Sequence, residues 1–155
     1  TWIAVDPASA GGFVYPLGLF ARHGITREDF AVIDFAPGPG GQQEKVVLAV
    51  YAGKYDIGSI REGTLDVVAG KIDISRIKVL AESPFYPGWV FSSRRDFDAR
   101  SLQKIQEAML RLDYNDPEHE RILNAAKIRG IIASRDEEFQ SVRELAETLD
   151  FSLDN

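Results

Sequence analysis

The chain has 155 residues, of which 45% are hydrophobic, and this is enough to build the core of one ordinary domain or of two small lobes. Its 18 basic and 24 acidic residues give a net charge of −6, which argues against nucleic acid or an anionic membrane as the main partner. The absence of cysteine excludes disulfides, thiolate metal sites and cysteine nucleophiles, and no apolar run approaches the ~20 residues of a membrane span. If an anion binds to this acidic chain, local geometry must hold it.

Strands and helices are predicted to alternate along the first half of the chain. Apolar runs predict buried strands, and apolar residues at helical spacing predict helices that end at Gly24, Gly53 and Gly70. The predicted strands cover residues 2–5, 30–35, 55–60 and 77–81, and the predicted helices cover residues 13–23, 42–52 and 62–69. Between them, segment 36–41 is too rich in Pro and Gly for regular structure. This alternation is typical of an α/β fold with a mostly parallel sheet covered by helices.

A crossover rich in proline is predicted to separate this half from a second lobe. The sequence SPFYPG begins the crossover, to which we assign residues 83–93. Beyond it, the patterns predict strands over residues 89–93 and 128–133, and helices over residues 101–112, 117–126 and 136–149. Ser101 is the expected N-cap of the first of these helices. The expected organisation is a ligand-binding lobe over residues 1–82, a hinge over 83–93 and a C-terminal part over 94–155.

The segment DPASAGGFVYP leaves the first predicted strand through residues with almost no side chain. Small residues between the end of a strand and the start of a helix let an incoming group approach backbone N–H groups closely, and the helix dipole favours negative charge there. Ser9, Ala10, Gly11 and Gly12 are therefore candidate anion-binding residues. The alternative is a tight turn in which Ser9 only caps the helix. The pattern is neither GxGxxG nor a P-loop lysine motif, so it does not favour a nucleotide.

Further candidates follow other predicted elements. Gln43 lies at a predicted helix start, where its amide can bind a ligand or remain solvated. Arg61 and Glu62 follow a predicted strand, at the edge where open α/β sheets gather ligands, and the Arg61 guanidinium can hold an oxyanion; the alternative is an exposed pair of charges. Tyr86 and Trp89 flank the crossover, where they either line a cleft between lobes or pack in a core.

Catalysis finds no support in the distribution of titratable residues. His23 falls at a predicted helix end and His119 lies between two glutamates, so a dipole-complementing cap and an exposed position are expected. Asp56 is expected to form a structural turn or cap, and no Ser/His/Asp arrangement or metal-ligand spacing is present. We therefore expect a protein without enzymatic activity, metal or cofactor.

Several segments resemble the phosphonate-binding family of periplasmic solute-binding proteins, a branch of the two-lobed type II binding fold. The resemblance rests on DPASAGGFVYPLGLFARHGI, VVLAVYAGKYDIGSI, VLAESPFYPGWVF and the closing segment DEEFQSVREL. It implies one Rossmann-like lobe with a mostly parallel sheet and, in residues 94–155, the closing helices of the other lobe. In the family, a preceding segment of roughly 80 to 100 residues supplies most of that first lobe. We expect this segment, and any signal peptide, to lie outside the sequence that begins at Thr1.

The resemblance also implies a function and a ligand set. It implies non-catalytic, extracytoplasmic binding of a small phosphonate or phosphate-ester oxyanion for an ABC transporter permease. Ser9 matches a ligand-contacting serine of the family, Ala10 and Gly11 stand where Thr and Ser hydroxyls are frequent, and Gln43 stands where a ligand histidine would be. Trp89 occupies the place of an acidic residue that binds a ligand amino group, which argues against 2-aminoethylphosphonate.

Other interpretations stay open on the sequence alone. SIREGTLDVVAGKIDISRIKVL and YPGWVF are also similar to sensor domains of bacterial histidine kinases, so a ligand-sensing role is the alternative to transport. A related type II fold serves in the synthesis of a thiamine precursor, but a catalytic histidine constellation and a cofactor lysine site are lacking. Apolar helix faces after Trp89 that lack part of their sheet would favour a homodimer.

Overall fold

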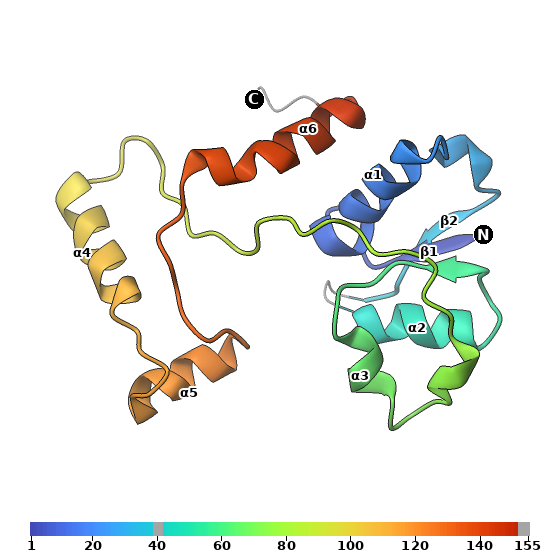
Figure 1. Cartoon of the computed structure of the whole chain (residues 1–155), viewed down its shortest axis with the longest axis horizontal. Coiled ribbons are helices and arrows are strands. Elements are labelled where there is room, and N and C mark those ends of the chain that lie inside the picture. The colour runs from blue at the N-terminus through green and yellow to red at the C-terminus, as the bar shows by residue number, and fades with distance from the viewer. Residues whose placement is uncertain (39–41, 152–155) are drawn as a thin grey trace. The chain divides into compact units, whose positions relative to one another are not determined.

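The computed structural model of the chain describes residues 1–38 and 42–151 (Figure 1). These residues form two compact units, one made of Thr1–Phe85 with the segment from Val142 onward, and one made of Tyr86–Ser141. The predicted loop over 36–41 lies partly outside the described residues, and Ala36 to Gly38 are in neither a helix nor a strand. The predicted organisation with a hinge over residues 83–93 stays a prediction.

The first unit is built on a parallel sheet, as the alternating pattern predicted. Its three strands follow the order β2-β1-β3, with β1 in the centre. Trp2 of β1 lies opposite Ile33 of β2 and Ile57 of β3. The strands are shorter than the predicted ones: β1 covers Trp2–Ala4, β2 covers Ile33–Phe35 and β3 covers Ile57–Gly58. The predicted α/β class is confirmed.

An aromatic cluster fills one face of this sheet, beneath helix α1 (Tyr15–Arg22). The Trp2 ring lies at its centre and is fully buried, with ring centroids 5.2 Å from Phe13, 5.0 Å from Phe20 and 5.1 Å from Phe30. Helix α1 ends before Gly24, whose φ of 72° is the left-handed conformation expected of a C-terminal glycine. The predicted helix over 13–23 is therefore confirmed, with a π-helical turn (Ala10–Val14) leading into it.

An aliphatic cluster fills the opposite face, beneath helix α2 (Gln43–Tyr51). Ile3, Val5 and Val46 are buried together there. Helix α2 approaches β3 so closely that a Cβ on Gly58 would lie 2.7 Å from Val46 Cγ1. The chain then forms the short helix α3 (Thr64–Val68) in place of the longer one predicted over 62–69. Figure 1 shows α1 and α2 on opposite sides of the strands.

The last helix, α6 (Gln140–Thr148), returns from Val142 onward to the first unit. A single 3-10 turn (Asp136–Phe139) precedes it, so the predicted helix over 136–149 is confirmed with a tighter first turn. Leu145 is buried against α1, where a Cβ on Gly18 would collide with Leu145 Cδ1. A glycine in α1 therefore makes room for a leucine of α6.

The second unit contains two amphipathic helices, α4 (Ala99–Leu110) and α5 (Pro117–Ala125), close to the predicted ranges. The predicted N-cap of α4 was wrong. The carboxylate of Asp98 caps this helix by accepting a 2.7 Å hydrogen bond from the Ser101 N–H, so Ser101 is a donor inside the first turn. Asp116 caps α5 in the same way. None of the helices in the described ranges is long and apolar enough to cross a membrane.

The predicted strands over 77–81, 89–93 and 128–133 are absent from the structure. A strand needs a neighbour to bond its N–H and C=O groups, and within residues 1–38 and 42–151 the only paired strands are β1, β2 and β3. Leu80, Phe91 and Ile132 are correspondingly exposed. The apolar pattern in these segments is strand-like, but nothing described here pairs with it.

Candidate functional site

The segments that follow β1 and β3 meet at the carboxyl edge of the sheet, where open α/β folds bind ligands. The hydroxyl of Ser59, just beyond β3, donates a 2.6 Å hydrogen bond to the carbonyl of Gly12. Arg61 is adjacent to the same loop, because a Cβ on Gly11 would lie 3.9 Å from Arg61 Cβ. Residues predicted from separate segments, Gly11, Gly12 and Arg61, are thus brought together.

The loop after β1 is held by its own polar groups. The Ala8 N–H donates to Asp6 Oδ1 at 2.8 Å, and the Ser9 N–H donates to the Asp6 carbonyl at 3.0 Å. Ser9 is the N-cap of the π-helical turn, and its Oγ accepts a 3.1 Å hydrogen bond from the Gly12 N–H. The predicted capping role of Ser9 is therefore present. It uses an acceptor site of the hydroxyl and leaves the proton able to donate elsewhere.

Pro16 gives a physical reason for the π-helical turn. A proline has no N–H to donate to the carbonyl four residues earlier, which is that of Gly12, and its ring collides with that carbonyl in a regular α-helix. The turn widens, and the Tyr15 N–H bonds the Ala10 carbonyl five residues back. Turns of this kind occur frequently at functional sites.

The start of the widened turn leaves two backbone donors without an acceptor among the described hydrogen bonds. The first N–H groups of a helix have no acceptor within the helix, and among the described hydrogen bonds none is donated by the N–H of Ala10 or Gly11. Ala10 is exposed and Gly11 is half-buried. Together with the hydroxyl proton of Ser9, these groups can donate to the oxygens of one small anion.

Gly12, the next residue in the loop, has no space for a side chain. A Cβ there would come within 2.6 Å of Val5 Cγ2 and 2.8 Å of Ser9 Oγ. Unlike the glycines that end α1 and α2, it has no positive φ. Close approach of the loop to β1, and not backbone conformation, therefore requires a glycine at this position.

Two buried polar side chains fix the backbone of Arg61. Gln43 Oε1 accepts a 3.0 Å hydrogen bond from the Arg61 N–H, and Thr64 Oγ1 donates a 2.8 Å bond to the Arg61 carbonyl. Gln43 is 9% exposed and Thr64 is 4% exposed, while the Arg61 side chain is exposed. Gln43 thus uses its amide oxygen within the protein, and a contact between Gln43 and a ligand stays a prediction. Glu62, the next residue, is also exposed.

Sequence reasoning missed Ser59 and Thr64. Ser59 is a short polar residue just past β3 at the carboxyl edge, and this position was the available signal; Thr64 is the first residue of α3, and a hydroxyl at the start of a helix was the signal there. Their partners, Gly12 for Ser59 and Arg61 for Thr64, become visible only in the folded chain.

Tyr86 and Trp89 belong to the second unit, so their predicted place in a cleft stays a prediction. Trp89 is 80% exposed, and Tyr86 is half-buried. His23 is the C-cap residue of α1. His119 lies in the first turn of α5, and its Nδ1 accepts a hydrogen bond from the N–H of Asp113, which precedes the helix. Among residues 1–38 and 42–151 there is no group of three or more His, Asp or Glu side chains that could hold a metal ion.

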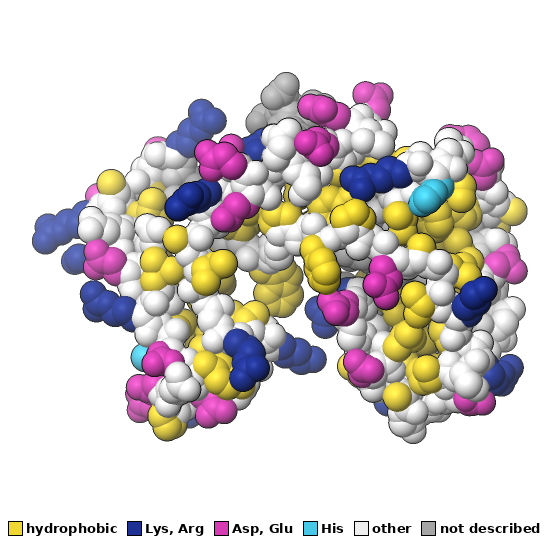
Figure 2. Space-filling model, in the orientation of Figure 1, with side chains coloured by type: hydrophobic (Ala, Val, Ile, Leu, Met, Phe, Trp, Pro, Cys, Tyr) yellow, Lys and Arg dark blue, Asp and Glu magenta, His cyan; other side chains and the backbone are white. Residues whose placement is uncertain are grey.

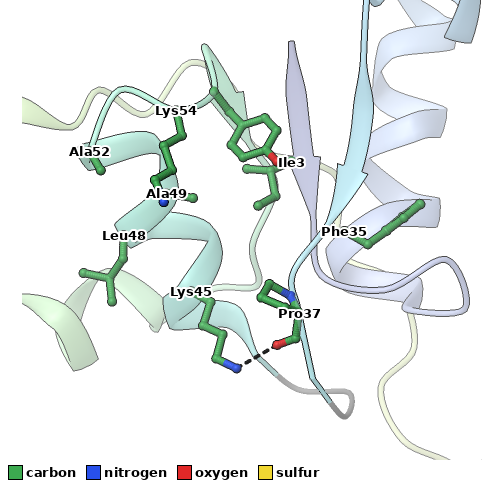
Figure 3. Close-up of a pocket in the computed structure, with 9 residues that line it drawn as sticks. Ile3, Phe35, Pro37, Lys45, Leu48, Ala49, Ala52 and Lys54 are labelled. Carbon is green, nitrogen blue, oxygen red and sulfur yellow. Dashed lines mark hydrogen bonds between the residues drawn. The ribbon is translucent and has the colours of Figure 1, made fainter.

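A groove of about 360 Å³ lies between α2 and the strands (Figure 3). Leu48 and Ala49 give it an apolar wall, and the Lys45 ammonium donates a 2.7 Å hydrogen bond to the Pro37 carbonyl. At its other end the Tyr55 hydroxyl donates to Asp34 at 2.8 Å, and this bond raises the pKa of Tyr55. None of the predicted ligand-binding residues lines this groove.

Comparison with known proteins places the chain in a family. A family profile described as "ABC transporter, phosphonate, periplasmic substrate-binding protein" matches residues 1–139. No curated protein matches the chain significantly. Among solved structures, PhnD1 from Prochlorococcus marinus (MIT 9301) in complex with methylphosphonate is similar, with a TM-score of 0.77 and 16% sequence identity. The similarity covers 96% of this chain and 56% of PhnD1, so the chain spans little more than half of that protein's length. The fold predicted from the resemblance is confirmed, and the chain belongs to the phosphonate-binding family of periplasmic substrate-binding proteins.

Proposed function

We propose that this chain binds a small tetrahedral oxyanion of the phosphonate class, without catalysis, as the periplasmic solute-binding component of an ABC transporter. The observation that carries this proposal is the set of available donors at Ser9, Ala10 and Gly11, which lies at the carboxyl edge of the sheet in a chain of the phosphonate-binding family. The partner that follows from the family is a transporter permease.

The charge around these donors supports an anionic ligand. Arg61 begins next to Gly11, with its Cβ in van der Waals reach of the loop, and its backbone is fixed on both sides by Gln43 and Thr64, so its long cationic side chain extends from the edge of the proposed site. Local geometry therefore compensates for a net charge of −6 over the whole chain. A guanidinium and several N–H donors suit the oxygens of a phosphonate better than they suit an uncharged sugar or a cation.

The residue types also bear on the substituent of the ligand. Ala10 and Gly11 present backbone donors without hydroxyls, and Trp89 offers no carboxylate for an amino group. Methylphosphonate, the ligand in the PhnD1 structure, carries no amino group. We therefore propose a phosphonate with a small, uncharged substituent as the ligand.

The proposal is tested by thermal unfolding and calorimetric titration with methylphosphonate, 2-aminoethylphosphonate, phosphate, phosphite, sulfate and acetate. Methylphosphonate is expected to raise the midpoint of unfolding most, because a ligand that binds only the folded state stabilises it. Ser9→Ala is expected to weaken this binding by about 1 to 3 kcal/mol, the loss of a hydrogen bond to a charged group.

Ser75→Ala is the matched control. The Ser75 hydroxyl bonds only Asp73 within the described residues and lies in an exposed turn. If no anion in the panel changes the unfolding of the chain, or if Ser9→Ala binds like Ser75→Ala, the proposed site is wrong.

A further inference from the structure

The carbonyl of Gly12 needs a donor that its own helix position does not provide. The residue four positions later is Pro16, which lacks an N–H. The hydroxyl of Ser59 reaches this carbonyl from the end of β3 at 2.6 Å. A hydroxyl carries a single proton, so Ser59 commits that proton to the loop after β1.

The oxygen of the same hydroxyl is also engaged. It accepts a 3.0 Å hydrogen bond from the indole Nε1–H of Trp2, whose side chain is fully buried. A buried indole N–H needs an acceptor, and Ser59 supplies it. The order of donors is therefore fixed: Trp2 donates to Ser59, and Ser59 donates to Gly12.

Gly12 passes this constraint to the proposed anion site. Its carbonyl is held by Ser59, and its N–H donates to Ser9 Oγ at 3.1 Å. In the second bond the Ser9 oxygen acts as acceptor within the protein, so the Ser9 hydroxyl proton remains available to a ligand. Ser59 thus sets the position of Gly12, and Gly12 sets the orientation of the Ser9 hydroxyl.

We infer that Ser59 is a positioning residue for the anion site, and that the Trp2 indole senses occupation of that site through Ser59. The inference rests on the proposed function. The indole is coupled to the loop a second time, because its ring stacks on Phe13, the residue that follows Gly12, at a centroid distance of 5.2 Å. A ligand that draws the Ser9 to Gly12 backbone outward changes both contacts of the same ring.

The composition of the chain makes this testable by fluorescence. Its only tryptophans are Trp2, which is 0% exposed, and Trp89, which is 80% exposed. In a Trp89→Phe background, all tryptophan emission comes from Trp2. Because Trp89 is itself a candidate ligand residue, the methylphosphonate affinity of this background is first compared with that of the wild-type protein by calorimetry, and the other variants are then compared with the background. The experiment titrates this variant with methylphosphonate and follows emission and heat in parallel, with Ser59→Ala, Ser59→Thr and Ser75→Ala added in turn.

The expected result separates positioning from general stability. Ser59→Ala weakens methylphosphonate binding about tenfold, the upper range for one lost neutral hydrogen bond, and abolishes the ligand-induced change in Trp2 emission. Ser59→Thr, which keeps the hydroxyl, restores both the affinity and the emission change. Ser75→Ala leaves both at the level of the parent protein.

Several outcomes would overturn the inference. If Ser59→Ala unfolds more easily but binds with parental affinity, Ser59 is only structural. A Ser59→Thr variant that fails to restore binding has the same consequence. If Ser59→Ala does not fold, the inference is tested on the Trp89→Phe variant alone. The inference is rejected if calorimetry shows that this variant binds methylphosphonate while its Trp2 emission stays constant.

Failure of the proposed function gives a different pattern. If the wild-type protein takes up no methylphosphonate in calorimetry, both proposals fall together. If the parent binds and Ser9→Ala binds weakly while Ser59→Ala remains parental, the proposed function stands and only the role of Ser59 is wrong.

Discussion

At the scale of single residues, two adjacent glycines make opposite predictions. A Cβ at position 12 would meet Val5 Cγ2 at 2.6 Å, whereas a Cβ at position 11 would meet Arg61 Cβ at an ordinary 3.9 Å. Gly12→Ala should therefore lower the free energy of unfolding by about 1–3 kcal/mol through overpacking and abolish anion binding. Gly11→Ala should fold normally. Urea unfolding and calorimetric titration of the two variants check this, and similar behaviour of both would contradict the packing argument.

Arg61 carries the prediction about ligand charge. Because the Cβ of Arg61 lies beside Gly11 and its guanidinium can reach an anion bound there, Arg61→Gln should weaken methylphosphonate binding by about 1.5–3 kcal/mol, the range for hydrogen bonds to charged groups. Added salt should weaken methylphosphonate binding to the wild-type protein more than binding to Arg61→Gln, because salt screens the attraction between the guanidinium and the anion, which only the wild-type protein has. Arg100→Gln is the control, since it removes an exposed positive charge from the second unit. Titrations at low and high salt that show equal losses for both variants would remove Arg61 from the site.

At the scale of elements, the contact between α1 and α6 depends on a small residue facing a large one. Gly18→Ala places a Cβ against Leu145 Cδ1, in a region where Leu145 is buried, and should cost about 1–3 kcal/mol of stability. Leu145→Ala should cost about 2–5 kcal/mol by leaving a cavity. The double variant should cost less than the sum, because the methyl group added at position 18 occupies part of that cavity. Denaturant unfolding measures the cycle, with Gly70→Ala as the control at an open position.

The helices of the second unit make a prediction about pH. Hydrogen bonds from Ser101 to the Asp98 carboxylate lower the pKa of Asp98, and backbone hydrogen bonds from Glu118 and His119 lower the pKa of Asp116. A lowered folded-state pKa contributes stability above the ordinary value of 3.8 and loses it as pH falls through the folded pKa. Helix content followed by circular dichroism should therefore fall on acidification. In Asp98→Asn, which caps without titrating, α4 should lose this dependence.

At the scale of the whole molecule, large apolar side chains remain on the surface. Phe85 is 89% exposed and Ile132 is 84% exposed, and Leu80, Trp89 and Phe91 are exposed as well. Figure 2 shows hydrophobic side chains among the charged ones over the visible face. Because large apolar side chains exposed to water favour association, we predict that the chain forms homodimers as its concentration rises. Light scattering over a concentration series tests this, with Phe91→Ser expected to weaken association, and a monomer at every concentration would contradict it.

Features that depend on neighbouring residues, such as helix ends, could be predicted from the sequence. Features that depend on contacts between distant segments, such as strand pairing, could not. Glycines at 24 and 53 end helices as expected, because the left-handed cap is a property of the residue itself. The strand-like pattern at residues 89–93 failed to predict a strand, because pairing depends on a neighbour elsewhere in the chain. Asp98, and not Ser101, caps α4 because the carboxylate one turn earlier reaches the Ser101 N–H.

The site was predictable in part for the same reason. The small residues after β1 could be identified from the sequence, because a turn from strand to helix has a local pattern. That Gln43 would bond Arg61, or that Ser59 would bond Gly12, depends on which loops the sheet order places side by side. The order β2-β1-β3 brings the loops after β1 and β3 together, and the sequence does not state it directly.

The packing of Leu145 over Gly18 also has a consequence in time. Residues 18 and 145 are far apart in the sequence, so the first unit is complete only after α6 has been synthesised. Closing so long a loop costs entropy before the contact forms, and such distant contacts slow folding. During synthesis, the face of α1 around Gly18 stays exposed to solvent until α6 has been made and packs against it. We expect α6 to dock in a late, separate kinetic phase of refolding.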